Sequence, residues 1–119
     1  STINLFVNDC IGFKMKSEQL LYYSPNAFGT ADAISFKDST LRIFDFKSGV
    51  LRASFKQLDI YAALFCLEYD VNPSSIKIEE RLYQSNEYVE SFPDGEYINS
   101  IMASIVGFDN ILETVKQEI

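Results

Sequence analysis

Hydrophobic and polar positions in the first half of the chain predict a short helix followed by three strands. Apolar residues recur at helical spacing over residues 3–15, and Gly12 is expected to end this helix. Residues 18–23 are typical of a strand, and a Pro-Asn pair at 25–26 supplies a turn into a second strand. Turn-forming residues at 37–40 then lead into a third strand with alternating faces.

A buried helix and a further strand are predicted next. Ser54 and Gln57 have the S-x-x-Q spacing of a helix N-terminus, and this helix is expected to run to about Tyr69. Residues 60–67 are apolar nearly all round, so the helix should be sandwiched against a sheet. Residues 76–84 are typical of a strand, and a strand-helix-strand succession implies a right-handed crossover and a parallel pair. The pattern therefore predicts an α+β fold in which helices flank a central mixed β-sheet.

A long helix is predicted at the C-terminus, over about residues 96–119, after Pro-Asp-Gly at 93–95. Its apolar residues recur in steps of three and four, as in a seven-residue repeat: Ile98, Ile101, Ile105, Phe108, Leu112, Val115 and Ile119. Such a helix is roughly 36 Å long, more than a domain of this size needs. We favour packing of this helix across its own domain, with pairing to a second copy of the chain as the alternative.

Length and composition indicate one compact domain over residues 1–119, because 119 residues with 47% apolar content form a single core. The longest apolar run, residues 60–67, is far shorter than the roughly 20 residues that span a bilayer, so no membrane association is expected. Cys10 and Cys66 do not make a disulfide framework, and a reducing, cytoplasmic setting is the expectation.

The residue types that are absent narrow the chemistry. The chain has no histidine, which excludes catalytic triads with an imidazole base and histidine-metal sites. Its two cysteines cannot form a cysteine-rich zinc site. Lys47-Ser48 resembles the end of a phosphate-binding loop, but Phe46 occupies the position that requires glycine. Carboxylates acting with a lysine are the chemistry that remains.

The second and third strands carry the candidate site. If Phe36 lies opposite Leu41, the register of the hairpin places Asp32 directly opposite Asp45. Such like charges repel, and a divalent cation with oxygen ligands would offset the repulsion. Lys47 follows Asp45 on the same face and adds a positive charge. The alternatives are that both aspartates are solvated surface residues or that one is protonated.

The net charge of −7 is concentrated in the C-terminal half. Residues 1–60 carry seven Lys or Arg and six Asp or Glu, whereas residues 61–119 carry three and eleven. Five cations surround the hairpin and are compatible with a local phosphate-binding surface: Lys37, Arg42, Lys47, Arg52 and Lys56.

Three motifs follow one another in this order: Gly-Thr-Ala-Asp at 29–32, Asp-Phe-Lys at 45–47, and Gln-x-x-x-Tyr at 57–61. Together they resemble the PD-(D/E)XK nuclease superfamily and, within it, the RecB-like exonucleases found in phages. The resemblance spans about residues 18–84 and implies a restriction-endonuclease-like core.

The resemblance also implies residue roles. Asp32 and Asp45 would bind one or two Mg²⁺ or Mn²⁺ ions, with the Phe46 backbone carbonyl as an extra ligand, and Lys47 would hold or activate the attacking water. Gln57 and Tyr61 lie one helical turn apart and would contact the water or a DNA phosphate. The structural alternative is equally strong: Gln57 occupies a capping-box position, and Tyr61 suits a core.

The chain departs from the family pattern at its start. Many RecB-like members have an upstream histidine and an acidic residue on an N-terminal helix, and this chain has no histidine. Glu18 is the first choice for the missing acidic metal ligand and Asp9 the second. The alternative is that each is an ordinary surface carboxylate.

The function expected from this resemblance is metal-dependent hydrolysis of DNA phosphodiester bonds. An exonuclease is expected rather than an endonuclease, acting in phage DNA recombination or processing in the bacterial cytoplasm. DNA is the expected partner, with self-association or a recombination protein as further partners. The alternative is a catalytically silent module that binds DNA or a protein through the C-terminal helix.

Overall fold

The computed structural model of the chain describes residues 1–49 and 54–119. Arg52, one of the five cations predicted around the hairpin, lies outside the described residues. In the described part of the chain, no helix is both long and apolar enough to cross a membrane.

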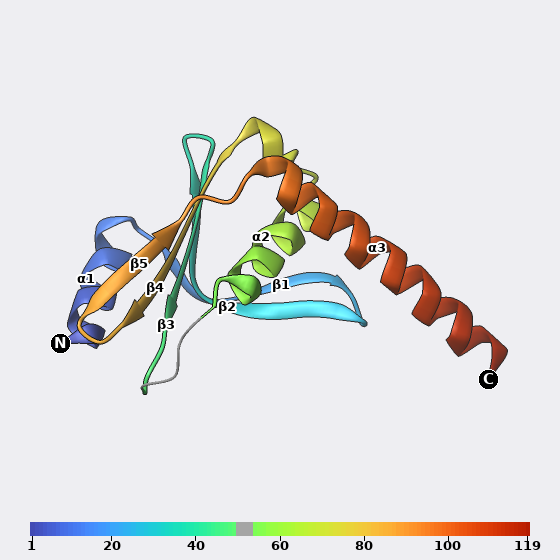
Figure 1. Cartoon of the computed structure of the whole chain (residues 1–119), viewed down its shortest axis with the longest axis horizontal. Helices are drawn as coiled ribbons and strands as arrows, with labels where there is room; N and C mark the ends of the chain where they lie inside the picture. Colours follow the sequence, from blue (N-terminus) through green and yellow to red (C-terminus); the bar gives the residue numbers. More distant parts are fainter. Residues whose placement is uncertain (50–53) are drawn as a thin grey trace.

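Helices flank a mixed five-stranded sheet, as the sequence predicts (Figure 1). The α-helices are α1 (Thr2–Gly12), α2 (Lys56–Glu68) and α3 (Gly95–Glu118). The strands are β1 (Lys16–Ser24), β2 (Ala27–Lys37), β3 (Thr40–Phe46), β4 (Lys77–Gln84) and β5 (Glu87–Ser91). They lie in chain order across the sheet, and all neighbours are antiparallel except β3 and β4, which are parallel. The predicted parallel pair on either side of α2 is therefore confirmed.

The turn between β2 and β3 has the predicted register. Asp38 and Ser39 have φ values of 52° and 55°, a left-handed pair that matches a two-residue hairpin turn. Phe36 pairs with Leu41, and the same register continues to Ala33 opposite Phe44.

Helix α2 is sandwiched between the sheet and α3, because most of its side chains are buried (Figure 1). Leu58, Ala62 and Leu64 pack in one cluster with Ile43 and Leu82 of the sheet. Helix α1 covers the opposite face, where a second and smaller cluster is built around Phe44 and Tyr83. The sheet thus has a large α2-facing core and a smaller aromatic α1-facing core.

Strand β5 was not predicted from the sequence. It pairs with β4 after a tight turn in which Ser85 and Asn86 have φ values of 56° and 65°. Tyr88 and Val89 of this strand remain 39% and 57% exposed. The apolar signal of β5 is weak because an edge strand buries little of its surface.

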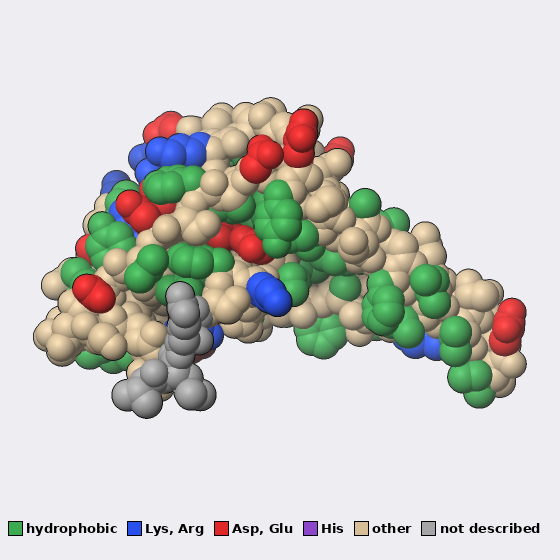
Figure 2. Space-filling view, viewed as in Figure 1, with side chains coloured by type: hydrophobic (Ala, Val, Ile, Leu, Met, Phe, Trp, Pro, Cys, Tyr) green, Lys and Arg blue, Asp and Glu red, His purple; other side chains and the backbone are tan. Residues whose placement is uncertain are grey.

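Helix α3 only partly follows the favoured prediction of packing across its own domain. Ile98 is buried, and Ile101 and Ile105 pack against the main core. Beyond this point the apolar repeat is largely uncovered: Phe108 and Val115 are 61% and 48% exposed. The helix projects past α2, and hydrophobic side chains lie on the surface of its outer part (Figures 1 and 2).

The outer part of α3 is held by polar contacts instead. Asp109 accepts hydrogen bonds from Ser24 Oγ, at the end of β1, at 2.6 Å and from Asn26 Nδ2, in the β1–β2 turn, at 2.8 Å. Glu113 and Lys116 also contact the side chain of Asn26. The prediction of packing is thus right for the first half of α3 and wrong for the apolar residues of its second half.

Candidate active site

Asp32 and Asp45 come together where β2 and β3 leave the regular ladder. Asp32 Oδ2 accepts a hydrogen bond from the Phe46 backbone N–H at 3.0 Å. Asp45 is 5% exposed and lies close enough to Asp32 for a hydrogen bond between the two carboxyl groups. The two acids predicted to face each other therefore converge, and the Phe46 backbone lies beside them.

The side chains of β2 do not alternate regularly between the two faces of the sheet around Asp32, contrary to the prediction from the sequence. Ala31 packs in the α2-facing cluster and Ala33 in the α1-facing cluster, so β2 changes face at Asp32. The ladder between β2 and β3 accordingly begins at Ala33. Asp32 thus lies at an irregularity within β2, just beyond the ladder with β3, and its bond to the β3 backbone anchors its carboxylate beside Asp45.

The electrostatics of the pair disfavour two negative charges. Burial, together with the hydrogen bond and the charge of Asp32, raises the pKa of Asp45 to about 6, although Lys47 opposes the shift. Lys47 Nζ lies 2.8 Å from Asp45 Oδ2, and this pairing raises the pKa of Lys47. One ammonium group therefore faces two carboxyl groups.

A line of hydrogen bonds connects this pair to α2. Lys47 Nζ donates to Gln57 Oε1 at 3.3 Å, and Gln57 Nε2 donates to the Tyr61 hydroxyl at 2.7 Å. Burial, followed by the negative charges of Asp45 and Asp32, raises the pKa of Tyr61. All five predicted catalytic residues thus belong to one continuous polar constellation.

The capping alternative for Gln57 is wrong. The Lys56 backbone N–H bonds Ser54 Oγ at 3.2 Å, while the Gln57 side chain bonds Lys47 and Tyr61 instead of the helix end. The core alternative for Tyr61 is confirmed in part, since the residue is 8% exposed and packs in the main cluster. Its ring is buried while its hydroxyl reaches the polar constellation.

Gly29 makes room for this tyrosine. A Cβ atom at residue 29 would lie 2.7 Å from Tyr61 Cε1, which is closer than atoms can approach. The glycine of the Gly-Thr-Ala-Asp motif therefore has a packing role, because it allows the Tyr61 ring of α2 to pack closely against β2.

Neither candidate for an upstream acidic ligand joins the site. Glu18 is exposed with a φ of 50°, and its side chain makes no hydrogen bond or ion pair with any described residue. Asp9 Oδ2 instead accepts a hydrogen bond from Tyr83 at 2.7 Å and pairs with Arg81 at 3.3 Å. Across residues 1–49 and 54–119, no group of three or more Cys, Asp and Glu residues could hold a metal ion.

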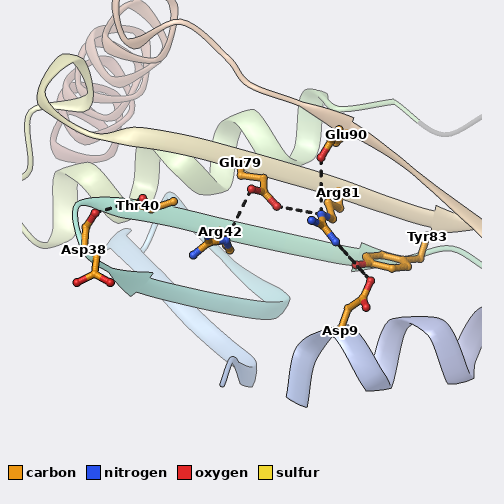
Figure 3. A network of polar contacts seen from close by, with 8 residues as sticks. All are labelled: Asp9, Asp38, Thr40, Arg42, Glu79, Arg81, Tyr83 and Glu90. Atoms are coloured by element: carbon orange, nitrogen blue, oxygen red, sulfur yellow. Dashed lines mark hydrogen bonds and ion pairs between the residues drawn. The ribbon is translucent and has the colours of Figure 1, made fainter. Parts of the chain in front are cut away.

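A polar network on the α1-facing side of the sheet was missed by the sequence analysis (Figure 3). Arg81 pairs with Glu79 at 2.9 Å and with Asp9 at 3.3 Å, and its guanidinium lies over the rings of Phe13, Phe44 and Tyr88. Arg42 also pairs with Glu79, at 3.7 Å. Arg81 is thus surrounded by aromatic rings and by carboxylates of opposite charge, and we interpret this network as structural.

Two further acids are buried on the α2-facing side. Glu80 is fully buried, and burial with a hydrogen bond to Asp59 raises its pKa to about 10. Both carboxylate oxygens of Glu80 and Oδ1 of Asp59 lack another hydrogen-bond partner. The sequence carries a signal for Glu80, which alternates with the buried residues Ile78 and Leu82.

Comparison of the sequence with known proteins identifies the family to which the chain belongs. Residues 3–78 match the family described as "Protein of unknown function (DUF2800)". The chain belongs to the DUF2800 family. The region shared with DUF2800 contains Asp32, Asp45, Lys47, Gln57 and Tyr61, whereas β5 and α3 lie beyond it. No curated protein and no solved structure matches the chain.

Proposed function

We propose that this chain is a metal-dependent deoxyribonuclease that hydrolyses phosphodiester bonds. The observation that carries the proposal is the convergence of Asp32, Asp45 and Lys47, extended by the hydrogen bonds to Gln57 and Tyr61. Exonuclease action in phage DNA recombination or processing follows from the resemblance of the three motifs to RecB-like enzymes.

The acids fit a hard divalent cation such as Mg²⁺ or Mn²⁺. Asp32 and Asp45 offer carboxylate oxygens, and the Phe46 carbonyl is the third protein ligand that the resemblance implies. Two carboxylates suffice for Mg²⁺, which keeps several waters and also binds substrate phosphate. A bound ion would stabilise both ionised carboxylates, polarise the phosphate and lower the pKa of a bound water.

The other residues supply positive charge and orientation. The Lys47 ammonium is fixed by Asp45 and Gln57, so it can hold an attacking water or a phosphate oxygen in one place. The Tyr61 hydroxyl orients the Gln57 amide, which leaves the position of Lys47 well defined.

Calorimetric titration with Mn²⁺ tests the proposal. We expect binding to wild-type protein and its loss in Asp32→Asn and Asp45→Asn, because each variant removes one ionised ligand. Asp38→Asn is the matched control, since this exposed turn aspartate lies outside the constellation. Absence of Mn²⁺ binding by the wild type would refute the proposal.

Cleavage of end-labelled DNA with Mn²⁺ or Mg²⁺ is the second measurement. Lys47→Met should lower the rate by at least about 100-fold, as removal of a group that stabilises transition-state charge does elsewhere. Mn²⁺ binding should persist in this variant because both carboxylates remain.

A second function is favoured by one feature, the uncovered apolar residues of outer α3. A catalytically silent module would use Phe108, Ile111 and Val115 to bind a protein partner or a second copy of the chain. It predicts no cleavage of DNA with either ion and a concentration-dependent mass in light scattering. DNA cleavage would exclude this alternative.

A further inference from the structure

A cavity of about 640 Å³ lies between the start of β1, the end of β2 and the C-terminal end of α2. Its floor is apolar and includes Leu21, Ile34 and Val71. Its lining also contains three lysines, Lys14, Lys16 and Lys37, whose residues are all exposed. No Asp or Glu is among the described residues that line it.

These lysines differ from most other cations of the described chain. Arg42, Arg81, Lys47 and Lys116 all form ion pairs, whereas Lys14, Lys16 and Lys37 form none with any described residue. In a protein with a net charge of −7, three unpaired lysines around one cavity create a local positive surface.

Aromatic rings complete the cavity wall. Phe36 and Tyr69 are 45% and 52% exposed, and Phe65 lies between them, with ring centroids 5.2 Å from Phe36 and 4.8 Å from Tyr69. Phe36 and Tyr69 are thus held by contact with a buried ring and offer apolar surface to solvent. Such aromatic surface beside lysines suits planar bases linked by phosphates.

We propose that this cavity, the lysine–aromatic cleft, binds a segment of single-stranded DNA. Bases stack on Phe36 and Tyr69, and phosphates pair with Lys14, Lys16 and Lys37. The choice of DNA rests on the proposed nuclease function, whereas the requirement for unstacked bases comes from the exposed rings.

Helix α2 links the cleft to the candidate active site. Tyr61, Phe65 and Tyr69 succeed one another at intervals of four residues, so they form one stripe along the helix. Phe65 and Tyr69 lie about 6 Å and 12 Å along the axis from Tyr61. At about 3.4 Å for each stacked nucleotide, the distance of about 12 Å between Tyr61 and Tyr69 corresponds to three or four nucleotides.

Fluorescence anisotropy with labelled oligo(dT), in EDTA so that metal plays no part, tests the cleft. We expect Tyr69→Leu to weaken binding by about 5- to 150-fold, the range for loss of one base–aromatic stack. Tyr97→Leu is the matched control, because Tyr97 is 49% exposed on α3 and lies outside the cleft.

A variant with Lys14, Lys16 and Lys37 all changed to Gln tests the charges without altering the core. The slope of log affinity against log salt should fall by about 2, since each phosphate contact on a single strand contributes about 0.7. Lys116→Gln, on outer α3, should leave the slope unchanged.

Binding of oligo(dT) that is equal in wild type, Tyr69→Leu and the triple lysine variant would overturn the proposal, as would no binding by the wild type. A duplex that competes as well as oligo(dT) would also overturn it. If oligo(dT) binding needs the cleft but Mn²⁺ binding and cleavage are absent, the cleft stands and the nuclease proposal falls.

Discussion

The two faces of the sheet treat buried charge in opposite ways. On the α1-facing side, Arg81 lies between Glu79 and Asp9, and Arg42 adds a second cation. Four acids lie on the α2-facing side or, for Asp32, at the change of face in β2, and in the described chain Lys47 is the only cation that pairs with any of them. These acids are Asp32, Asp45, Asp59 and Glu80.

The difference lies in how each side of the sheet offsets its negative charges. Matched charges hold the α1-facing side together. On the α2-facing side, burial and the neighbouring acids raise the pKa values of Asp45 and Glu80, so protonation relieves the excess of negative charge. Perturbed acids of this kind are typical of functional sites, whereas charge-matched networks are typical of scaffolds.

Removing the cation of the α1-facing side should have the largest effect on stability. Arg81→Met keeps much of the packing but leaves Asp9 without a cation and Glu79 with Arg42 alone, so we expect a loss of about 3 kcal/mol. Urea unfolding measures this loss in the free energy of unfolding. Glu90→Gln is the control, because Glu90 lies 3.9 Å from Arg81 Nε with a 44% exposed side chain, and it should cost under about 1 kcal/mol. Equal losses in both variants would contradict a charge-matched network.

Removing an acid from the α2-facing side should stabilise the protein. The pKa of Glu80 is about 10 in the folded state, above its unfolded value, so folding retains a proton that the unfolded chain releases as pH rises above about 4.5. Stability is therefore fully present at low pH and falls as pH rises. Glu80→Gln should raise Tm by roughly 5–10 °C at pH 8 and leave it nearly unchanged at pH 4.

Thermal melts at pH 4, 6 and 8 measure this difference. Glu79→Gln is the matched control, because Glu79 is the preceding residue of β4 but faces the charge-matched side. It should lower Tm at pH 8, since it weakens the pairs with Arg81 and Arg42. If Glu80→Gln has a lower Tm than the wild type at pH 8, the idea that excess acids destabilise the α2-facing side is wrong.

Asp45→Asn should separate stability from function. Burial and the neighbouring Asp32 raise the pKa of Asp45 to about 6, so the ionised form destabilises the fold at pH 8. We expect a gain of about 1–2 kcal/mol in urea unfolding, together with loss of Mn²⁺ binding. A variant less stable than wild type would indicate that the pair with Lys47 outweighs the repulsion.

The smallest expected effect concerns one hydroxyl group. Tyr83 donates a hydrogen bond to Asp9 at 2.7 Å and accepts one from Arg81 at 3.2 Å. Tyr83→Phe removes both bonds, and we expect a loss of about 1 kcal/mol in urea unfolding. In the Arg81→Met background the loss should be smaller, because the network is already broken.

Local signals in the sequence were sufficient for most elements. The turn at Asp38 and Ser39 determined the register of β2 and β3 as far as Ala33 opposite Phe44, which are the neighbours of Asp32 and Asp45. Two features depend on packing that local signals do not contain. The change of face at Asp32 requires α1 and α2 to pack on opposite sides of one strand. How much of α3 is covered depends on how far the rest of the domain extends along the helix.

The burial of charged residues in β4 was not predicted from the sequence either. Glu79, Glu80 and Arg81 are successive in the sequence, and alternation places Glu80 on the face opposite to its two neighbours. Their charges suggest a solvated strand, but β4 lies between β3 and β5, with helices covering it. Pairing with residues far away in the chain, such as Asp9 and Asp59, is what permits their burial.

The bare backbone at Gly29 sets the depth at which α2 rests on the sheet. A methyl group there would collide with the Tyr61 ring and push the helix outward. Gln57, one turn earlier on the same stripe, would move with it, and its 3.3 Å bond to Lys47 has little length to spare. A single hydrogen atom in place of a side chain thus keeps the helix within reach of the lysine.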